Sequence, residues 1–180
     1  MKANLSDSKG LVMDVSNDAD EKSDALTQFL TFELGHERFG INILHIREII
    51  EYKQVTTVPM MPAFITGVIN LRGNVVPVIN LASRFGKGST ELTKRTSVVI
   101  VELEQNDTKL EAGVVVDVVN AVLDIAPSDI EPAPSFGSSI RTDFIEGMGK
   151  VEEGLLILLN MNNILSVDEL SAVVDSQQST

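Results

Sequence analysis

The sequence contains no cysteine, no tryptophan and only two histidines. The lack of cysteine excludes disulfides and thiolate metal sites, and it is compatible with a reducing cytosol. Because aromatic residues make up only 4% of the chain, the core must be built mainly from Val, Ile and Leu, a composition that favours strands. At 180 residues the chain can form one large domain or two small ones.

Basic residues are also scarce, with 14 Lys and Arg against 26 Asp and Glu and a net charge of −12. A protein with this charge repels phosphate groups, so nucleic acids and anionic membranes are poor partners. The longest apolar run, around residues 155–159, has the length of a strand and not of a membrane span. The first residues lack the features of a signal peptide. The sequence therefore predicts a soluble, cytoplasmic protein.

Groups that could carry catalysis are few and scattered. His36 lies in a predicted turn, and His45 borders an apolar segment without a second ligand at metal-binding spacing. No glycine-rich nucleotide loop is present. Asp117 and Asp124 could serve acid–base chemistry, although solvent-facing positions explain them more simply. We expect a binding protein without enzyme activity, metal or cofactor. A small enzyme that uses Asp117 or Asp124 and an oligonucleotide-binding barrel are the alternatives.

Alternating apolar residues predict strands in the first half of the chain. Residues 29–34 and 39–43 fit two strands separated by a polar turn. Residues 45–52 fit both helical and strand spacing, and we favour a short turn followed by a strand. Pro59 and Pro62 interrupt a loop that could hold one helical turn at residues 63–65. An apolar hairpin follows at residues 67–77.

Short helices and loose ends complete the prediction. Asn80 is placed to cap a helix over residues 81–85. Ser166 and Glu169 form a capping box for a terminal helix, which would dock Leu170, Val173 and Val174. Residues 1–27 are polar and predict a flexible tail, and residues 175–180 predict a loose C-terminus. The ordered domain would thus span residues 28–174.

The second half of the chain repeats the order of the first. Residues 98–103 match 29–34, residues 113–116 match 40–43, and residues 144–160 match 64–80 without a gap. Such an ordered series indicates two subdomains of related topology. Residues 114–119 are apolar on both strand faces, so one face would fill its own barrel. The other would cover the neighbouring subdomain or form an exposed groove.

Arg72 stands near the tip of the first hairpin, where the repeat has Glu152. The fold therefore does not require arginine at this position. Arg72 is either a solvated charge or a residue that recognises a partner or pairs with Glu48.

Two segments resemble the CheW-type chemotaxis coupling proteins. One is Phe64-Ile65-x-Gly67-Val68-x-Asn70-Leu71-Arg72-Gly73-x-x-x-Pro77-Val78, and the other is Phe39-Gly40-Ile41-x-Ile43-x-x-Ile46-x-Glu48-Ile49. The similarity extends from about Phe29 to the terminal helix. It implies an all-β fold of two interleaved SH3-like β-barrel subdomains, with short helices and a C-terminal helix. No receiver domain follows, which favours the simple coupling protein.

The resemblance also implies a function. Such a protein is a non-enzymatic adaptor that couples chemoreceptors to the histidine kinase CheA, and it joins membrane receptor arrays through these partners. The tip of the receptor's helical hairpin would lie in the seam between the barrels. The residues carried over to this receptor-facing region are Ile46, Glu48, Gly67, Arg72, Val98, Gly113, Val119 and Val122. The regulatory domain of the kinase would contact the first barrel near Val55, Thr56, Ser83, Arg84 and Phe85, with Phe136 at a second, ring-closing contact.

Overall fold

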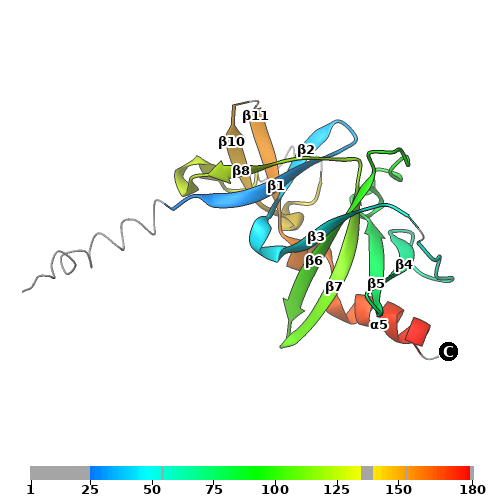
Figure 1. Ribbon diagram of the computed structural model, residues 1–180. Helices are drawn as coiled ribbons and strands as arrows, with labels where there is room; N and C mark the ends of the chain where they lie inside the picture. Colours follow the sequence, from blue (N-terminus) through cyan, green and yellow to red (C-terminus); the bar gives the residue numbers. More distant parts are fainter. Residues whose placement is uncertain (1–24, 54, 135–139, 153, 179–180) are drawn as a thin grey trace, which may run out of the picture.

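The computed structural model describes residues 25–53, 55–134, 140–152 and 154–178 (Figure 1). Of the predicted tail, residues 1–24 lie outside this part of the chain, and Thr27 already begins the first strand. The first half of the chain forms β1 (Thr27–Leu34), β2 (Glu37–Asn42), η1 (Ile43–His45), β3 (Ile46–Glu51), β4 (Ile65–Leu71), β5 (Asn74–Asn80) and α3 (Leu81–Arg84). The second half forms β6 (Ser97–Gln105), β7 (Thr108–Val116), β8 (Val118–Ile125), η2 (Pro127–Asp129), β9 (Ile130–Glu131), η3 (Thr142–Phe144), β10 (Ile145–Val151), β11 (Gly154–Leu159), α4 (Met161–Ile164) and α5 (Val167–Gln178).

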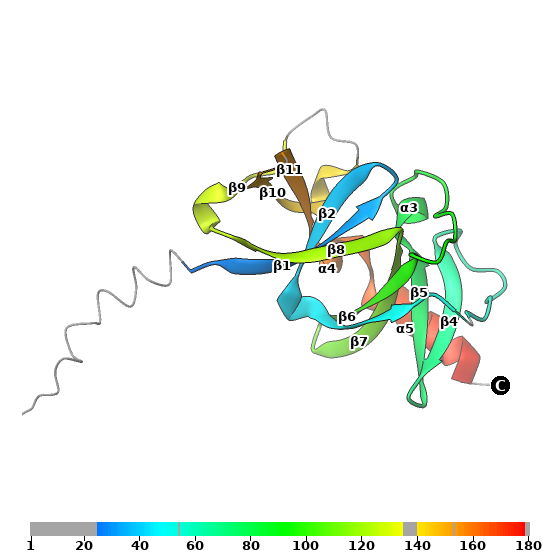
Figure 2. The ribbon, with the colours of Figure 1, turned by 45° about the horizontal axis from the view of Figure 1, so that its top comes forward.

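The strands form two sheets that exchange elements between the halves. One sheet has the order β8-β1-β2-β11-β10-β9 and the other has the order β3-β6-β7-β5-β4. In the first sheet, β1 and β2 come from the first half of the chain and the other strands from the second half. In the second sheet, β6 and β7 come from the second half and the other strands from the first. Figures 1 and 2 show the two sheets side by side. We call them the β1 barrel and the β4 barrel. The predicted all-β fold with two interleaved subdomains is confirmed.

Both sheets curl and close in corresponding ways. After β3, Thr56 pairs with Val68 of β4 through two backbone hydrogen bonds of 2.8 Å. After β8, β9 pairs with β10 at Glu131 and Met148, and Met148 is the residue that corresponds to Val68. In each barrel one parallel pair joins the halves, β5 with β7 and β11 with β2. The duplication inferred from the sequence is thus a duplication of hydrogen-bond pattern.

Three groups of buried residues form the core. Val98, Ile100 and Val115 fill the β4 barrel, and a smaller group around Phe29 fills the β1 barrel. The largest group is shared by both sheets and includes Val114 and Val116. The two faces of β7 therefore serve its own barrel and the neighbouring one. Intersubdomain packing, and not an exposed groove, explains this part of the apolar stretch.

Helices α3 and α5 begin where the sequence predicts, and α4 follows Asn160 as α3 follows Asn80. Asn80 and Asn160 accept hydrogen bonds from the backbone N–H groups of Ser83 (3.0 Å) and Asn163 (3.2 Å), which caps α3 and α4. The Oγ of Ser166 accepts from the N–H of Glu169 at 3.3 Å before α5, and buried side chains of α5 dock against the shared core. The helix runs along β5 and β7 (Figure 1).

Two local predictions differ from the structure. Helix α5 continues to Gln178, past the predicted boundary at Val174, because residues 175–178 contain no glycine or proline to end it. The helical turn considered at residues 63–65 is a simple turn closed by a 3.0 Å hydrogen bond from the Ile65 N–H to the Pro62 carbonyl. Strand β4 begins at Ile65, where pairing with β5 takes over the backbone groups.

Candidate partner-binding surfaces

The tip of the β4–β5 hairpin holds Arg72 in a left-handed conformation. Its φ is +52° and that of Gly73 is +83°, the pattern of a type I′ turn. The Asn70 side chain stabilises the turn by accepting a 3.0 Å hydrogen bond from the Gly73 N–H. A left-handed residue other than glycine costs about 1 kcal/mol. The turn alone therefore disfavours arginine here.

Arg72 forms an ion pair across the opening of the β4 barrel. Its Nη2 lies 2.5 Å from the Oε1 of Glu48, and the strands that carry the two residues are opposite edges of the same sheet. The Arg72 side chain is 68% exposed and that of Glu48 is 27% exposed. A pair this accessible contributes at most about 1 kcal/mol. The pairing considered from the sequence is confirmed, and most of the guanidinium remains open to a partner.

Gly67, Val98 and Gly113 lie inside the β4 barrel. A Cβ on Gly67 would come 2.0 Å from the Thr56 carbonyl oxygen, and one on Gly113 would come 2.5 Å from Val98 Cγ1. Val98 itself is buried. These three residues determine how closely strands and side chains approach, and a partner at the surface does not reach them.

The remaining residues carried over to the receptor-facing region lie on corresponding strands of the two barrels. Ile46 on β3 and Val119 on β8 are half-buried against the shared core between the barrels. Val122, further along β8, is 44% exposed. Both strands are edge strands, since β3 pairs with β6 and β8 pairs with β1. The seam between the barrels thus presents aliphatic side chains from both of them.

Two exposed apolar residues near this seam were missed from the sequence. Leu44 in η1 is 85% exposed and Ile49 on β3 is 44% exposed. Ile50, the next residue, packs against the interior of the β4 barrel. The available signal was the density of apolar residues in 41–50, which exceeds what one strand face can bury.

The residues carried over as the first kinase contact divide into two groups. Thr56 is exposed and Val55 is half-buried at the β4 barrel. Thr56 also lines a pocket of about 620 Å³ together with Ile50, Ile69 and Leu71. This part of the barrel is open and partly apolar, which suits a protein contact.

In the second group, in and after α3, Arg84 and Phe85 point into the molecule, whereas Ser83 bonds to the exposed loop that follows the helix. The Arg84 Nε donates a 2.8 Å hydrogen bond to the Ile164 carbonyl. The Phe85 ring lies 5.6 Å from that of Phe39 and 5.8 Å from that of Phe144. Ser83 donates to the Gly88 carbonyl at 2.8 Å. Phe136, expected at a second kinase contact, lies outside the described residues.

The two aspartates considered for catalysis lie apart. Asp117 accepts a 2.7 Å hydrogen bond from the Gly35 N–H and so holds the β1–β2 turn. Asp124 pairs with Gln28 near the opposite end of the β1–β8 ladder and is exposed. They therefore do not form an acid–base pair. In the described part of the chain, no group of His, Asp and Glu is arranged to hold a metal ion. None of the described helices is long and apolar enough to cross a membrane.

Comparisons with known proteins agree with this geometry. Residues 28–169 match the family described as "CheW-like domain". The chain is 38% identical over 146 residues to a chemotaxis protein CheW from Klebsiella aerogenes, a match that covers 81% of this chain and 86% of that protein. It is 30% identical over 155 residues to the CheW of Treponema pallidum, covering 85% and 90%. Among solved structures, the scaffolding protein TtCheW from Thermoanaerobacter tengcongensis superposes with a TM-score of 0.71 at 34% identity, covering 80% and 90%.

Proposed function

Because this chain belongs to the CheW-like domain family, it is a chemotaxis coupling adaptor, and we propose that it holds a chemoreceptor and the histidine kinase CheA on two separate surfaces. Such an adaptor needs no catalytic group. It needs two faces of modest affinity on one scaffold, so that occupation of one face biases the other. It works in the cytoplasm and associates with membrane receptor arrays through these partners.

The receptor-facing surface is the seam between the barrels. Ile46, Val119 and Val122 supply its apolar floor, and Arg72 and Glu48 supply charges at its rim. An amphipathic helical hairpin suits such a surface, because its apolar face contacts these aliphatic side chains while its polar residues meet the charged rim. Gly67, Val98 and Gly113 support this surface from inside the β4 barrel by keeping its strands in place.

The kinase-facing surface is the open part of the β4 barrel around Val55 and Thr56, together with Ser83 in α3. Arg84 and Phe85 lie behind it and hold α3 against the other half of the chain. We retain Phe136 as a residue of a second kinase contact.

The observation that carries the receptor assignment is the exposed, left-handed Arg72. The local backbone disfavours it, the corresponding tip has Glu152, and most of its side chain is open to a partner. A residue kept against its own turn preference is expected to serve an intermolecular contact.

Arg72→Glu tests this assignment. The change places two carboxylates opposite each other, so we expect about tenfold weaker capture by a soluble receptor tip. Unfolding stability should fall by no more than about 1 kcal/mol. Binding to the receptor tip and to CheA is measured separately by pull-down and calorimetry.

Glu152→Lys, a charge reversal at the corresponding tip of the β1 barrel, is the matched control and should leave receptor binding intact. If folded Arg72→Glu binds the receptor tip as the unchanged protein does, the role of Arg72 is lost. If the unchanged protein binds neither partner, the proposed function itself fails.

A further inference from the structure

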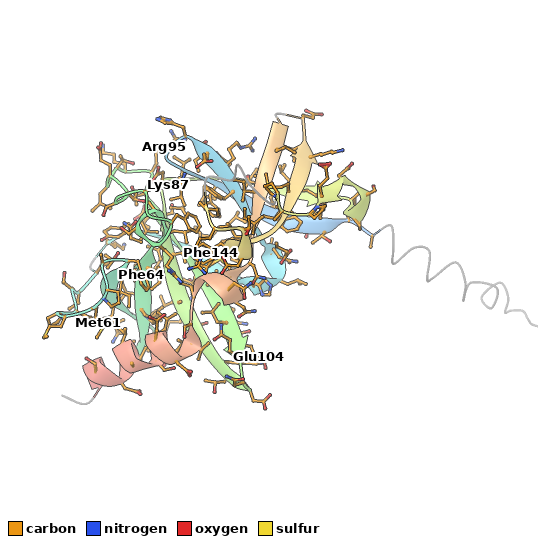
Figure 3. All side chains as sticks on the ribbon, turned by 180° about the vertical axis from the view of Figure 1, so that it is seen from behind. Met61, Phe64, Lys87, Arg95, Glu104 and Phe144 are labelled. Atoms are coloured by element: carbon orange, nitrogen blue, oxygen red, sulfur yellow. The ribbon has the colours of Figure 1, made fainter. Side chains whose placement is uncertain are left out.

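Arg84 lies between corresponding residues of the two halves. Its guanidinium carbon is 4.9 Å from the ring centroids of both Phe64 and Phe144, which are separated by the 80-residue offset of the duplication. Its hydrogen-bond acceptor, Ile164, corresponds to Arg84 itself by the same offset. The Arg84 guanidinium is thus shared equally between corresponding aromatic side chains of the two halves. Figure 3 shows Phe144 near the centre of the molecule and Phe64 beside it on the side of the β4 barrel.

The duplication supplies arginine at this position in the first copy only, since the corresponding residue of the second copy is Ile164. Arg84 is therefore the cation that contacts both rings, and Arg141 lies over Phe144 as well, with its guanidinium carbon 4.8 Å from the ring centroid. Within the part of the chain that the structure describes, no carboxylate pairs with Arg84. Its charge is met by the two π faces and by the Ile164 carbonyl, a half-buried setting in which cation–π contacts are worth more than at the surface.

The neighbouring residue extends the same connection. Phe85 contacts Phe39 of β2 and Phe144 of η3, and Phe39 in turn lies 5.9 Å from Phe32 of β1. Helix α3 leaves the β4 barrel at the end of β5, whereas Phe32 and Phe39 belong to the β1 barrel. Helix α3 therefore links the two barrels through contacts of defined geometry.

We propose that Arg84 is a positioning residue that sets the relative orientation of the two barrels. Apolar contacts in the shared core are non-directional, whereas a hydrogen bond and a cation between two rings constrain angle as well as distance. Since Ile46 and Val119 come from different barrels, a change of this orientation reshapes the seam between them. In the part that rests on the proposed function, Arg84 thereby links the receptor-facing seam to the kinase-facing surface.

The absence of cysteine allows a direct measurement. Cysteines placed at Lys109 on β7 and Glu146 on β10, both exposed, carry one spin label on each barrel, and pulsed electron paramagnetic resonance gives the distance distribution. The protein with native Arg84 should give one narrow distribution. Arg84→Met keeps the apolar stem but removes the charge and the donor, so the distribution should broaden or shift. Arg84→Lys retains a cation and should fall between them.

Arg95→Met, the same substitution at an exposed loop arginine, is the control and should leave the distribution narrow. A distribution for Arg84→Met that matches the native one overturns the proposal. If Arg84→Met does not fold, Arg84→Lys is measured instead. A distance distribution in Arg84→Lys that matches the native one then also overturns the proposal.

A second measurement separates this inference from the proposed function. The affinity of CheA for the chain is determined with and without a soluble receptor tip, and the ratio reports coupling, expected on the order of fivefold or more. Arg84→Met should move the ratio toward one. If Arg84→Met lost kinase binding while the label distances stayed unchanged, Arg84 would be a surface contact for the kinase. That result would contradict its proposed role in orienting the two barrels. If the native protein binds neither partner, the proposed function fails while the distance result still stands.

Discussion

Two exposed residues have a left-handed backbone conformation whose strain glycine or asparagine would reduce. Arg72 has a φ of +52° and Met60 has a φ of +60°. Arg72 forms an ion pair with Glu48 and is the residue we propose for a partner contact. Met60 is fully exposed between Pro59 and Met61, and no contact in the structure explains a methionine there.

Met60→Asn should therefore stabilise the fold. Asparagine tolerates the left-handed region far better than methionine, and no buried contact is lost, so we expect a gain of up to about 1 kcal/mol. Urea unfolding should show a higher midpoint with an unchanged slope. Leu92→Asn, an exposed leucine at ordinary φ, should give no gain. An unchanged midpoint for Met60→Asn would mean that its left-handed backbone stores no strain.

At the scale of elements, local pattern predicted most of the strands, the caps of α3 and α5, and the turn that precedes β3. These depend on period-two alternation and on side-chain hydrogen bonds within a few residues. The partners of the edge strands could not be read in this way, because β3 pairs with β6 and β8 pairs with β1 across the chain. The exposed Leu44 and Ile49 were missed for the same reason, since exposure depends on distant neighbours.

One side chain joins the β6–β7 hairpin to the last two helices. The Gln105 Nε2 donates to the carbonyls of Asn162 and Leu165 at 2.9 and 3.0 Å, and its Oε1 accepts from the Val167 N–H at 3.0 Å. It thus serves the end of α4 and the start of α5 at once, which sequence spacing gave no reason to expect.

Gln105→Ala should cost about 1–3 kcal/mol, because it leaves backbone groups at a partly buried junction without partners. Thermal unfolding measures the loss, and amide exchange should localise it to α5. Glu104→Ala at the neighbouring exposed position should change stability by less than about 0.5 kcal/mol. Equal losses in the two variants would show that the Gln105 bonds do not hold the helix.

At the scale of the whole molecule, duplication and exchange occur together. The sequence revealed two copies, and the family resemblance implied that they interleave. Residue pattern alone would equally have allowed each copy to close its own barrel. The choice is made by nonlocal pairing, in which β5 adds to β7 and β11 adds to β2. The seam between the barrels is a consequence of this exchange, since Ile46 and Val119 meet the same shared core from different sheets.

This exchange predicts that neither half folds alone. A chain ending at residue 90 has β1 and β2 of one barrel but only β3, β4 and β5 of the other. The shared core would lose one side, so too little apolar surface would be buried to offset the conformational entropy. Residues 25–90 and 91–178, produced separately, should show no cooperative thermal transition.

Mixing the two halves should restore the fold, because every strand then finds the partner it has in the intact chain. At an equimolar ratio, the mixture should recover the native circular dichroism spectrum. It should also show a cooperative thermal transition whose midpoint temperature rises with protein concentration. The full chain cut in the 86–96 loop after folding is the control and should remain assembled. A cooperative transition in either isolated half would mean that one copy can close a barrel by itself, in which case the observed exchange would not be required for folding.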